Sequence, residues 1–244
     1  MIIYKVPKPI SIIGEYSNKC MIFSSCNFSY LSKFGNVKSF FVDKKTKNFY
    51  KRCFKNYTTI KSKLINLIQD DDFPSCYTSI YGNINYINKS SICWNNTRLN
   101  VSNSFFENLL IFHIKRKYFK YDKIKPIEDF NIETVNKMVE DAYECYINND
   151  LKFMGKLIDS YWRIKVKFDP NSANEFIFKL YSDCRLAGAW GGKMDENTML
   201  ILAPKEKHQE IYSVMKDHII LNSSVNTTGI LREELFSGNS NCCK

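Results

Sequence analysis

The chain has few of the residues that build metal centres and membrane spans. It has only three histidines, and its nine cysteines form no Cys-x-x-Cys pair, so a zinc site is not expected. No apolar run approaches the ~18 residues that a membrane-spanning helix needs. The cysteines are odd in number and irregularly spaced, which favours reduced thiols in a cytoplasmic protein. The apolar N-terminus is broken by Pro7 and Pro9 and predicts a strand rather than a signal peptide.

Acidic residues are also scarce relative to basic ones. Lysine and arginine number 35 against 25 aspartates and glutamates, which gives a formal net charge of +10. Such a charge favours anionic partners: nucleotides, sugar phosphates or nucleic acid. The densest basic segment, 113–123, interleaves lysines with aromatics, a pattern compatible with binding of single-stranded nucleic acid. A solvated strand end followed by a loop explains the same segment more simply, so nucleic acid is not the favoured partner.

The first half of the chain has the composition of β-strands. Short runs rich in Ile, Val, Phe and Tyr are separated by Asn, Ser, Gly and Lys. We expect strands at 1–6, 9–13, 37–43, 47–54, 84–88 and 105–113, and a short helix at 60–68.

The second half has the periodicity of amphipathic helices. Asn131 is a plausible N-cap for a first helix, and the run Asn148-Asn149-Asp150 ends it and begins the next. Pro170 ends the second helix, and Asn171 or Ser172 caps a third. A strand at 198–203 and a helix at 205–218 follow. The fold class is therefore α+β, with a strand-rich N-terminal lobe (1–115) and a helix-rich C-terminal lobe (116–244) of helices on an antiparallel sheet.

A glycine cluster separates the third helix from the strand at 198–203. The run Ala187-Gly188-Ala189-Trp190-Gly191-Gly192-Lys193 places three glycines within five positions and a lysine directly after them. Glycine lets a backbone approach a ligand or another backbone closely, and exposed N–H groups beside a lysine favour an anion. A tight turn between helix and strand is the simpler interpretation of such a cluster.

The order of these motifs resembles the GHMP small-molecule kinases, such as galactokinase, homoserine kinase and mevalonate kinase. The branch that phosphorylates heptose phosphates is the most similar, because it has a Trp-x-x-Lys element before an Ala-Gly-Ala-x-Gly-Gly-Lys run. Trp162 and Lys165 match the first element as a structural signature, and 187–193 matches the second. The strand that ends at Pro204 and the helix after it follow in the family's order. The resemblance implies a two-lobed fold, and a nucleotide or phosphate position at Gly191, Gly192 and Lys193.

The first half extends the resemblance. The opening 1–18 resembles the family's first strand and sugar-site loop, and 77–87 resembles its Gln-Tyr-x-x-x-Phe-Gly-Gly segment. The resemblance implies that four residues contact a sugar substrate: Gly14, Ser17, Asn18 and Tyr77.

The departures from the family pattern concern both phosphoryl transfer and sugar binding. The Gly-rich loop that cradles the nucleotide phosphates is missing, and only about 20 residues lie where the family uses roughly 70 more. Ser75 stands at the position of the catalytic aspartate, Pro9 at that of the sugar-contacting arginine and Asn18 at that of the turn aspartate. The glycine loop after Lys193 is shortened to 194–197. The acidic run 70–72 is interpreted as a solvated loop rather than as a replacement base or Mg²⁺ site.

Three hypotheses follow. The favoured one is a degenerate, inactive relative that binds a sugar phosphate, a nucleotide or a protein, with no catalytic residue and no metal. The second is an active sugar kinase with a rebuilt phosphate site, for which the resemblance implies ATP and Mg²⁺ as cofactors. The third is a basic nucleic-acid-binding protein. The truncated N-terminal lobe is further expected to expose an apolar face that a protein partner or a second copy covers.

Overall fold

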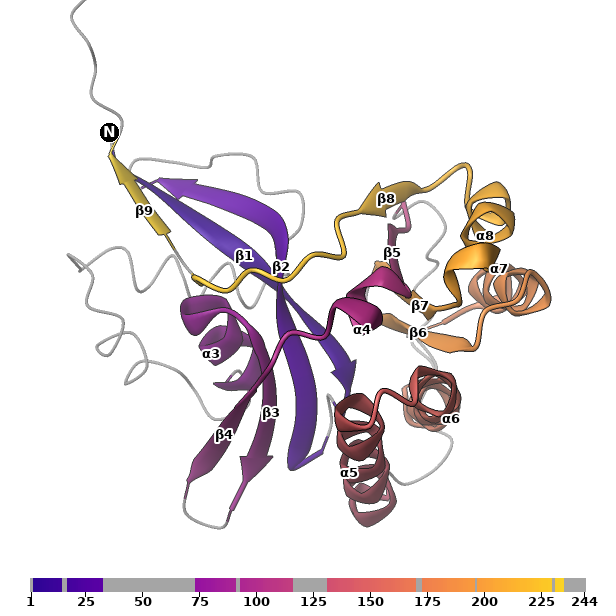
Figure 1. Ribbon diagram of the computed structural model, residues 1–244, viewed down its shortest axis with the longest axis horizontal. Helices are drawn as coiled ribbons and strands as arrows, with labels where there is room; N and C mark the ends of the chain where they lie inside the picture. The colour runs from indigo at the N-terminus through magenta and orange to yellow at the C-terminus, as the bar shows by residue number, and fades with distance from the viewer. Residues whose placement is uncertain are drawn as a thin grey trace, which may run out of the picture.

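The computed structural model has two antiparallel sheets flanked by helices (Figure 1). It describes residues 2–14, 17–32, 73–90, 93–115, 131–169, 173–195, 197–229 and 231–234. The expected strands at 37–43 and 47–54 and the expected helix at 60–68 lie outside these residues. The acidic run 70–72, the segment where the family's phosphate loop would fall and most of the basic segment 113–123 lie outside them as well.

The first sheet has five strands in the order β4-β3-β2-β1-β9. Their bounds are β1 Ile2–Ile13, β2 Lys19–Ser32, β3 Ile84–Lys89, β4 Trp94–Leu99 and β9 Leu231–Glu234. β3 confirms the strand expected at 84–88, whereas β2 and β4 were not expected. β1 runs through both prolines as one strand, and its register with β2 shifts between Pro7 and Pro9. A shift of this kind is how an antiparallel strand accommodates proline.

The second sheet has four strands in the order β6-β7-β5-β8. They are β5 Leu109–His113, β6 Gly191–Asp195, β7 Thr198–Leu202 and β8 Ile219–Leu221. β5 occupies only the end of the expected strand 105–113, because Asn103–Glu107 forms the short helix α4, which Ser102 caps. β6 replaces the expected turn at Gly191–Lys193. β5 lies in the second sheet and β9 in the first, so each half of the chain contributes a strand to the other half's sheet. The division at residue 115 as two folding units remains a prediction.

The helices predicted from periodicity are present. They are α5 Ile132–Ile147, α6 Leu151–Phe168, α7 Glu175–Leu186 and α8 His208–Val214, which follows a turn of 3₁₀ helix, η4 Lys205–Lys207. A further helix, α3 Phe73–Tyr81, was not expected. Asn131 caps α5 as expected, since its side chain accepts a hydrogen bond from the Thr134 amide at 2.9 Å. The expected cap of α7 is wrong: Asn174, not Asn171 or Ser172, accepts the Ile177 amide at 3.0 Å. The last helix ends at Val214 rather than near 218.

Three apolar clusters show what each face of the two sheets packs against. One contains Ile10, Ile12 and Phe23 of the first sheet, Leu200 and Leu202 of the second, and buried residues of α5 and α6, so it joins the two sheets. The second packs the other face of the second sheet against α7 and α8. The third lies under α3 on the other face of the first sheet. Figure 1 shows α3 on the first sheet, and α7 and α8 beyond the second.

Candidate functional site

Three lysines from different parts of the chain surround one carboxylate where the two sheets meet. Lys165 Nζ lies 3.2 Å from Asp195 Oδ1, and Lys8 Nζ donates a hydrogen bond to Thr198 Oγ1 at 2.6 Å. Lys193 and Lys8 both act electrostatically on Asp195. We call Lys8, Lys165, Lys193 and Asp195 the lysine cluster.

The pairing of β6 with β7 positions the cluster. Lys193 is opposite Leu200 and Asp195 is opposite Thr198 in the antiparallel register. Alternate residues of a strand point to the same face, so Lys193 and Asp195 share the face on which Leu200 joins the core between the sheets. In the pairing of β5 with β7, His113 is opposite the same Thr198. Asp195, Thr198 and His113 therefore form a polar row across three strands.

Helix α6 and strand β1 close the cluster from two further directions. Tyr161 and Lys165 are four residues apart on α6 and therefore lie on one face of the helix. Lys193 Nζ lies 5.7 Å from the centre of the Tyr161 ring. α6 can approach β6 this closely because Gly155 and Gly191 meet without side chains. Lys8 reaches Thr198 from β1, so the cluster takes residues from both sheets.

Burial and charge set the protonation states of the cluster. The Lys193 side chain is 1% exposed, and this burial lowers its pKa to about 8 although Asp195 favours the charged form. Burial alone would raise the pKa of Asp195, but Lys165, Lys193 and Lys8 outweigh it and lower the pKa to about 2. Asp195 is thus ionised at any physiological pH. Its side chain is 37% exposed, against 3% for Lys165, so the cluster opens to solvent at the carboxylate.

The structure brings together only part of the expected site. Lys165 and Lys193 are in the cluster, whereas Trp162 faces the other core, with its ring 4.6 Å from that of Tyr181. Gly191 and Gly192 lie inside β6 and form neither a turn nor a loop. A Cβ on Gly192 would lie 2.2 Å from the Leu200 carbonyl oxygen, so this glycine serves strand pairing.

Gly14, Ser17 and Asn18 form the turn between β1 and β2. Gly14 has φ +93°, and Ser17 Oγ donates to the Lys19 carbonyl oxygen at 2.5 Å. Lys19 beside them pairs with Glu140 of α5. Gly14 follows Lys8 by six positions along the strand, or about 20 Å at 3.3 Å per residue. This turn is therefore distinct from the lysine cluster.

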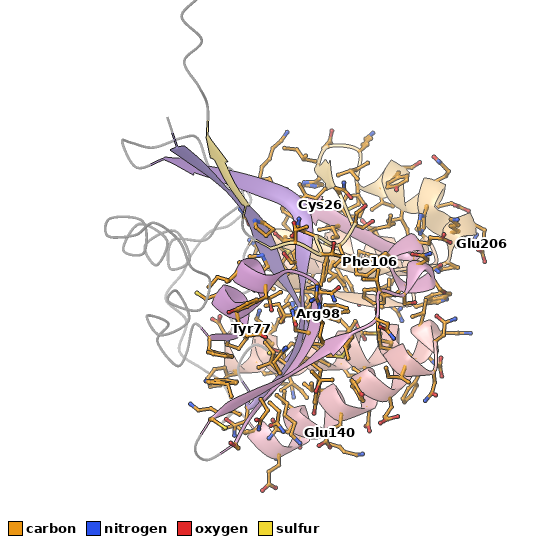
Figure 2. The ribbon with its side chains drawn as sticks, turned by 60° about the vertical axis from the view of Figure 1, so that its left-hand side comes forward. Cys26, Tyr77, Arg98, Phe106, Glu140 and Glu206 are labelled. Carbon is orange, nitrogen blue, oxygen red and sulfur yellow. The ribbon has the colours of Figure 1, made fainter. Side chains whose placement is uncertain are left out.

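Tyr77 lies on the far face of the first sheet. It packs with Phe73 and Trp94 around Cys20, Ile22 and Ile87, and its hydroxyl accepts a hydrogen bond from Asn96 Nδ2 at 3.2 Å. Figure 2 shows Tyr77 and Glu206 toward opposite sides of the molecule. The first sheet separates Tyr77 from the lysine cluster, so the structure does not assemble the four expected sugar-contacting residues with the expected phosphate residues. Ser75, which stands at the position of the family's catalytic aspartate, lies in α3, the helix that contains Tyr77.

Sequence reasoning missed Lys8, Thr198 and Asp195. Asp195 was interpreted as part of a shortened loop, although Lys-x-Asp has the alternation of a half-buried strand. Lys8 precedes Pro9, which was aligned with the family's sugar-contacting arginine, so a cation is present one residue away from the expected position. No pattern in the sequence links residue 8 with residue 198.

The donor set of the cluster fits an anion and does not fit Mg²⁺. Among the described residues, Asp195 is the carboxylate of the cluster, and three ammonium groups act on it. Mg²⁺ prefers carboxylates and phosphate oxygens in an environment that is not already cationic. No group of three His, Cys, Asp or Glu residues suited to a metal occurs in the described part of the chain. Lysine ammonium groups form charge-assisted hydrogen bonds with phosphate oxygens, so the residue types of the cluster match a phosphate group.

No helix among the described residues is long and apolar enough to cross a membrane.

Solved structures identify the architecture. No protein-family model matches the sequence, and no curated protein is significantly similar to it. A D-glycero-D-manno-heptose 1-phosphate kinase from Bacteroides thetaiotaomicron superposes with a TM-score of 0.66 at 9% identity, over 97% of this chain and 100% of that one. The chain has the GHMP-kinase fold. A Leishmania major mevalonate kinase in complex with R-mevalonate superposes with a TM-score of 0.59 at 9% identity, over 87% of this chain and 90% of that one. A Campylobacter jejuni protein described as a sugar kinase superposes with a TM-score of 0.64 at 10% identity, over 96% of this chain and 98% of that one.

These matches confirm the expected two-lobed α+β fold and the resemblance to GHMP kinases. At this level of identity they establish the architecture and carry no residue's role from one protein to another. The assignments of Gly14, Ser17, Asn18, Tyr77, Gly191, Gly192 and Lys193 to ligands remain predictions.

Proposed function

We propose that this chain uses a GHMP-kinase fold to bind a phosphorylated small molecule at the lysine cluster without transferring a phosphoryl group. The observation that supports it is the convergence of Lys8, Lys165 and Lys193 on the single carboxylate of Asp195. Three ammonium groups act on this carboxylate, and such a cationic setting suits a phosphate group. The match to a heptose 1-phosphate kinase favours a sugar phosphate as the ligand class.

The chemistry of Asp195 argues against phosphoryl transfer. A general base works best when its pKa lies near the operating pH. The lysines hold the pKa of Asp195 at about 2, so it is a weak base, and its ion pair with Lys165 occupies one of its oxygens. The position that resembles the catalytic aspartate is Ser75, whose hydroxyl cannot act as a carboxylate base.

The test is calorimetric titration of the purified chain at pH 7 with glucose 6-phosphate, inorganic phosphate and Mg-ATP. We expect the phosphates to bind and Lys165→Gln to weaken binding at least tenfold. Lys156→Gln is the matched control, because Lys156 is an exposed lysine of the same helix. Equal affinity in the wild type and in Lys165→Gln, or no binding of any of the phosphates at millimolar concentration, would overturn the proposal.

An assay for ADP release tests the alternative of an active sugar kinase, which the fold itself favours. ADP release from Mg-ATP that needs a sugar and is lost in Lys165→Gln would replace the binding role by catalysis. A parallel titration with single-stranded nucleic acid tests the third hypothesis, which requires affinity that falls steeply with salt.

A further inference from the structure

The neighbouring helices α5 and α6 carry opposite charges on their exposed sides (Figure 1). On α5 the exposed acids Glu133 and Glu144 are eleven positions apart, which is three helical turns, so they lie on one face. On α6 the exposed bases are spaced by four and seven positions and also share a face: Lys152, Lys156 and Arg163. An acidic face and a basic face therefore lie side by side on the surface.

Most of these charges have no counter-charge in the chain. Arg163 pairs within α6. The charges that form no ion pair among the described residues are Glu133, Glu144, Lys152 and Lys156. Each helix thus presents two charges of one sign that a partner of the opposite sign can neutralise.

Two exposed apolar side chains lie between these faces, on either side of the turn that joins the helices. Ile147 at the end of α5 is 55% exposed, and Phe153 in the first turn of α6 is 47% exposed. Exposed ion pairs alone contribute little to association, and specific interfaces combine them with apolar contact. The surface of this helix pair supplies both.

The helix pair fixes which charges would meet if two copies packed face to face. The short turn at 148–150 places the end of α5 beside the start of α6, so Glu144 lies at the same height along the helices as Lys152 and Lys156. Glu133, three turns away, lies at the height of Arg163. A twofold axis parallel to the helices keeps every residue at its height and places α5 of one chain over α6 of the other. Each acid then faces a base.

We propose that two copies of this chain associate through the exposed faces of α5 and α6, with α5 of each chain against α6 of its partner. The charge pattern favours a second copy as the occupant, because an acidic or a basic partner would match only one of the two helices. Helices of 16 and 18 residues that are about 10 Å wide present roughly 500 Å² per chain. The total of about 1,000 Å² is at the lower limit for a specific interface, so the dimer is expected to be weak and reversible.

Analytical ultracentrifugation of the full chain at one ionic strength tests the proposal. We expect Glu144→Lys and Lys152→Glu each to raise the dissociation constant of the dimer about tenfold or more, since each brings like charges together. The two changes alter the net charge in opposite directions, so overall repulsion between chains of formal charge +10 cannot explain both effects. The double variant Glu144→Lys/Lys152→Glu should return the dissociation constant to within about threefold of the wild type, because the opposite charges meet again.

Glu206→Lys is the matched control for Glu144→Lys. It changes the net charge equally, but Glu206 is an exposed residue of η4, and Figure 2 shows it on a different side of the molecule from Glu140 of α5. It should leave the dissociation constant unchanged. A chain that stays monomeric at all concentrations would overturn the proposal. A dimer that Glu144→Lys does not weaken, or that the double variant does not restore, would overturn it too, since such a dimer uses another surface.

Discussion

Gly155 of α6 and Gly191 of β6 pack backbone against backbone: a Cβ on Gly191 would lie 1.9 Å from the Gly155 carbonyl oxygen. No side chain can be rotated away to relieve that contact, so helix and strand would have to separate. We predict that Gly191→Ala lowers the free energy of unfolding by about 3 kcal/mol or more. Urea unfolding measures it, with Ser160→Ala, an exposed change in α6, as the control. A loss below about 1 kcal/mol would show that the two backbones do not touch.

The Lys193→Met substitution should stabilise the protein at neutral pH. The pKa of Lys193 is lowered from 10.5 to about 8, so between these values the native state binds fewer protons than the unfolded state. The cost of burying the charge is therefore fully present below pH 8 and disappears as the pH rises to 10.5. The shift corresponds to a cost on the order of 3 kcal/mol. In urea unfolding, Lys193→Met should raise the free energy of unfolding more at pH 7 than at pH 10. The control Lys156→Met should not raise it at either pH.

Asp195→Asn should change both the acid stability and the anion affinity. The pKa of Asp195 is lowered from 3.8 to about 2 in the folded state, so its contribution to stability is present above pH 3.8 and is lost as the pH falls to 2. In the variant this part of the acid transition should disappear. Removing the negative charge should also tighten sulfate binding about fivefold, equivalent to about 1 kcal/mol. Weaker sulfate binding would mean that the anion does not occupy the cluster.

The sequence and the structure assign the N-cap of α7 to different residues, and mutation can distinguish the two assignments. Asn174→Ala should lower the free energy of unfolding by about 1 kcal/mol, because the Ile177 amide loses its acceptor. Asn171→Ala and Ser172→Ala are the matched controls, since the sequence favoured these residues as caps. A larger effect at either control would restore the original assignment.

The expected partner of the first sheet remains to be tested. If the N-terminal lobe leaves part of its sheet uncovered beyond the described residues that α3 and the core between the sheets bury, a second copy or another protein should cover that part. We predict a homodimer, with twice the mass of one chain in light scattering. A monomer at all concentrations that also fails to bind a hydrophobic dye would contradict this prediction.

The sequence predicted the helices of the second half well, missed α3 and α4 in the first half, and predicted the strands unevenly. α5 and α6 were predicted because one face of each is apolar and polar residues mark the ends, as Asn131 and Asp150 do. β2 was missed because Cys20 and Ile22 are buried on one face and Met21 and Phe23 on the other, so no polar–apolar alternation is visible. β6 was missed because two glycines at its start indicate a turn unless the partner strand β7 is known.

The candidate site was predictable only in part for the same kind of reason. Lys165 and Lys193 were found through motifs that resemble a family, since each lies in a recognisable local run. Lys8 and Asp195 join them through pairings between segments far apart in the chain, one of them 190 residues apart. Such contacts depend on how the two sheets pack, and local patterns in a single sequence do not predict that packing.

The last described strand, β9, pairs with β1, so the edge of the first sheet is completed by residues 231–234. A ribosome adds more than 200 residues between β1 and β9, and until β9 emerges the edge of β1 that it covers has no partner. An open strand edge is a template for pairing with other chains. During synthesis, the nascent chain is therefore vulnerable to aggregation for longer at its beginning than at its middle.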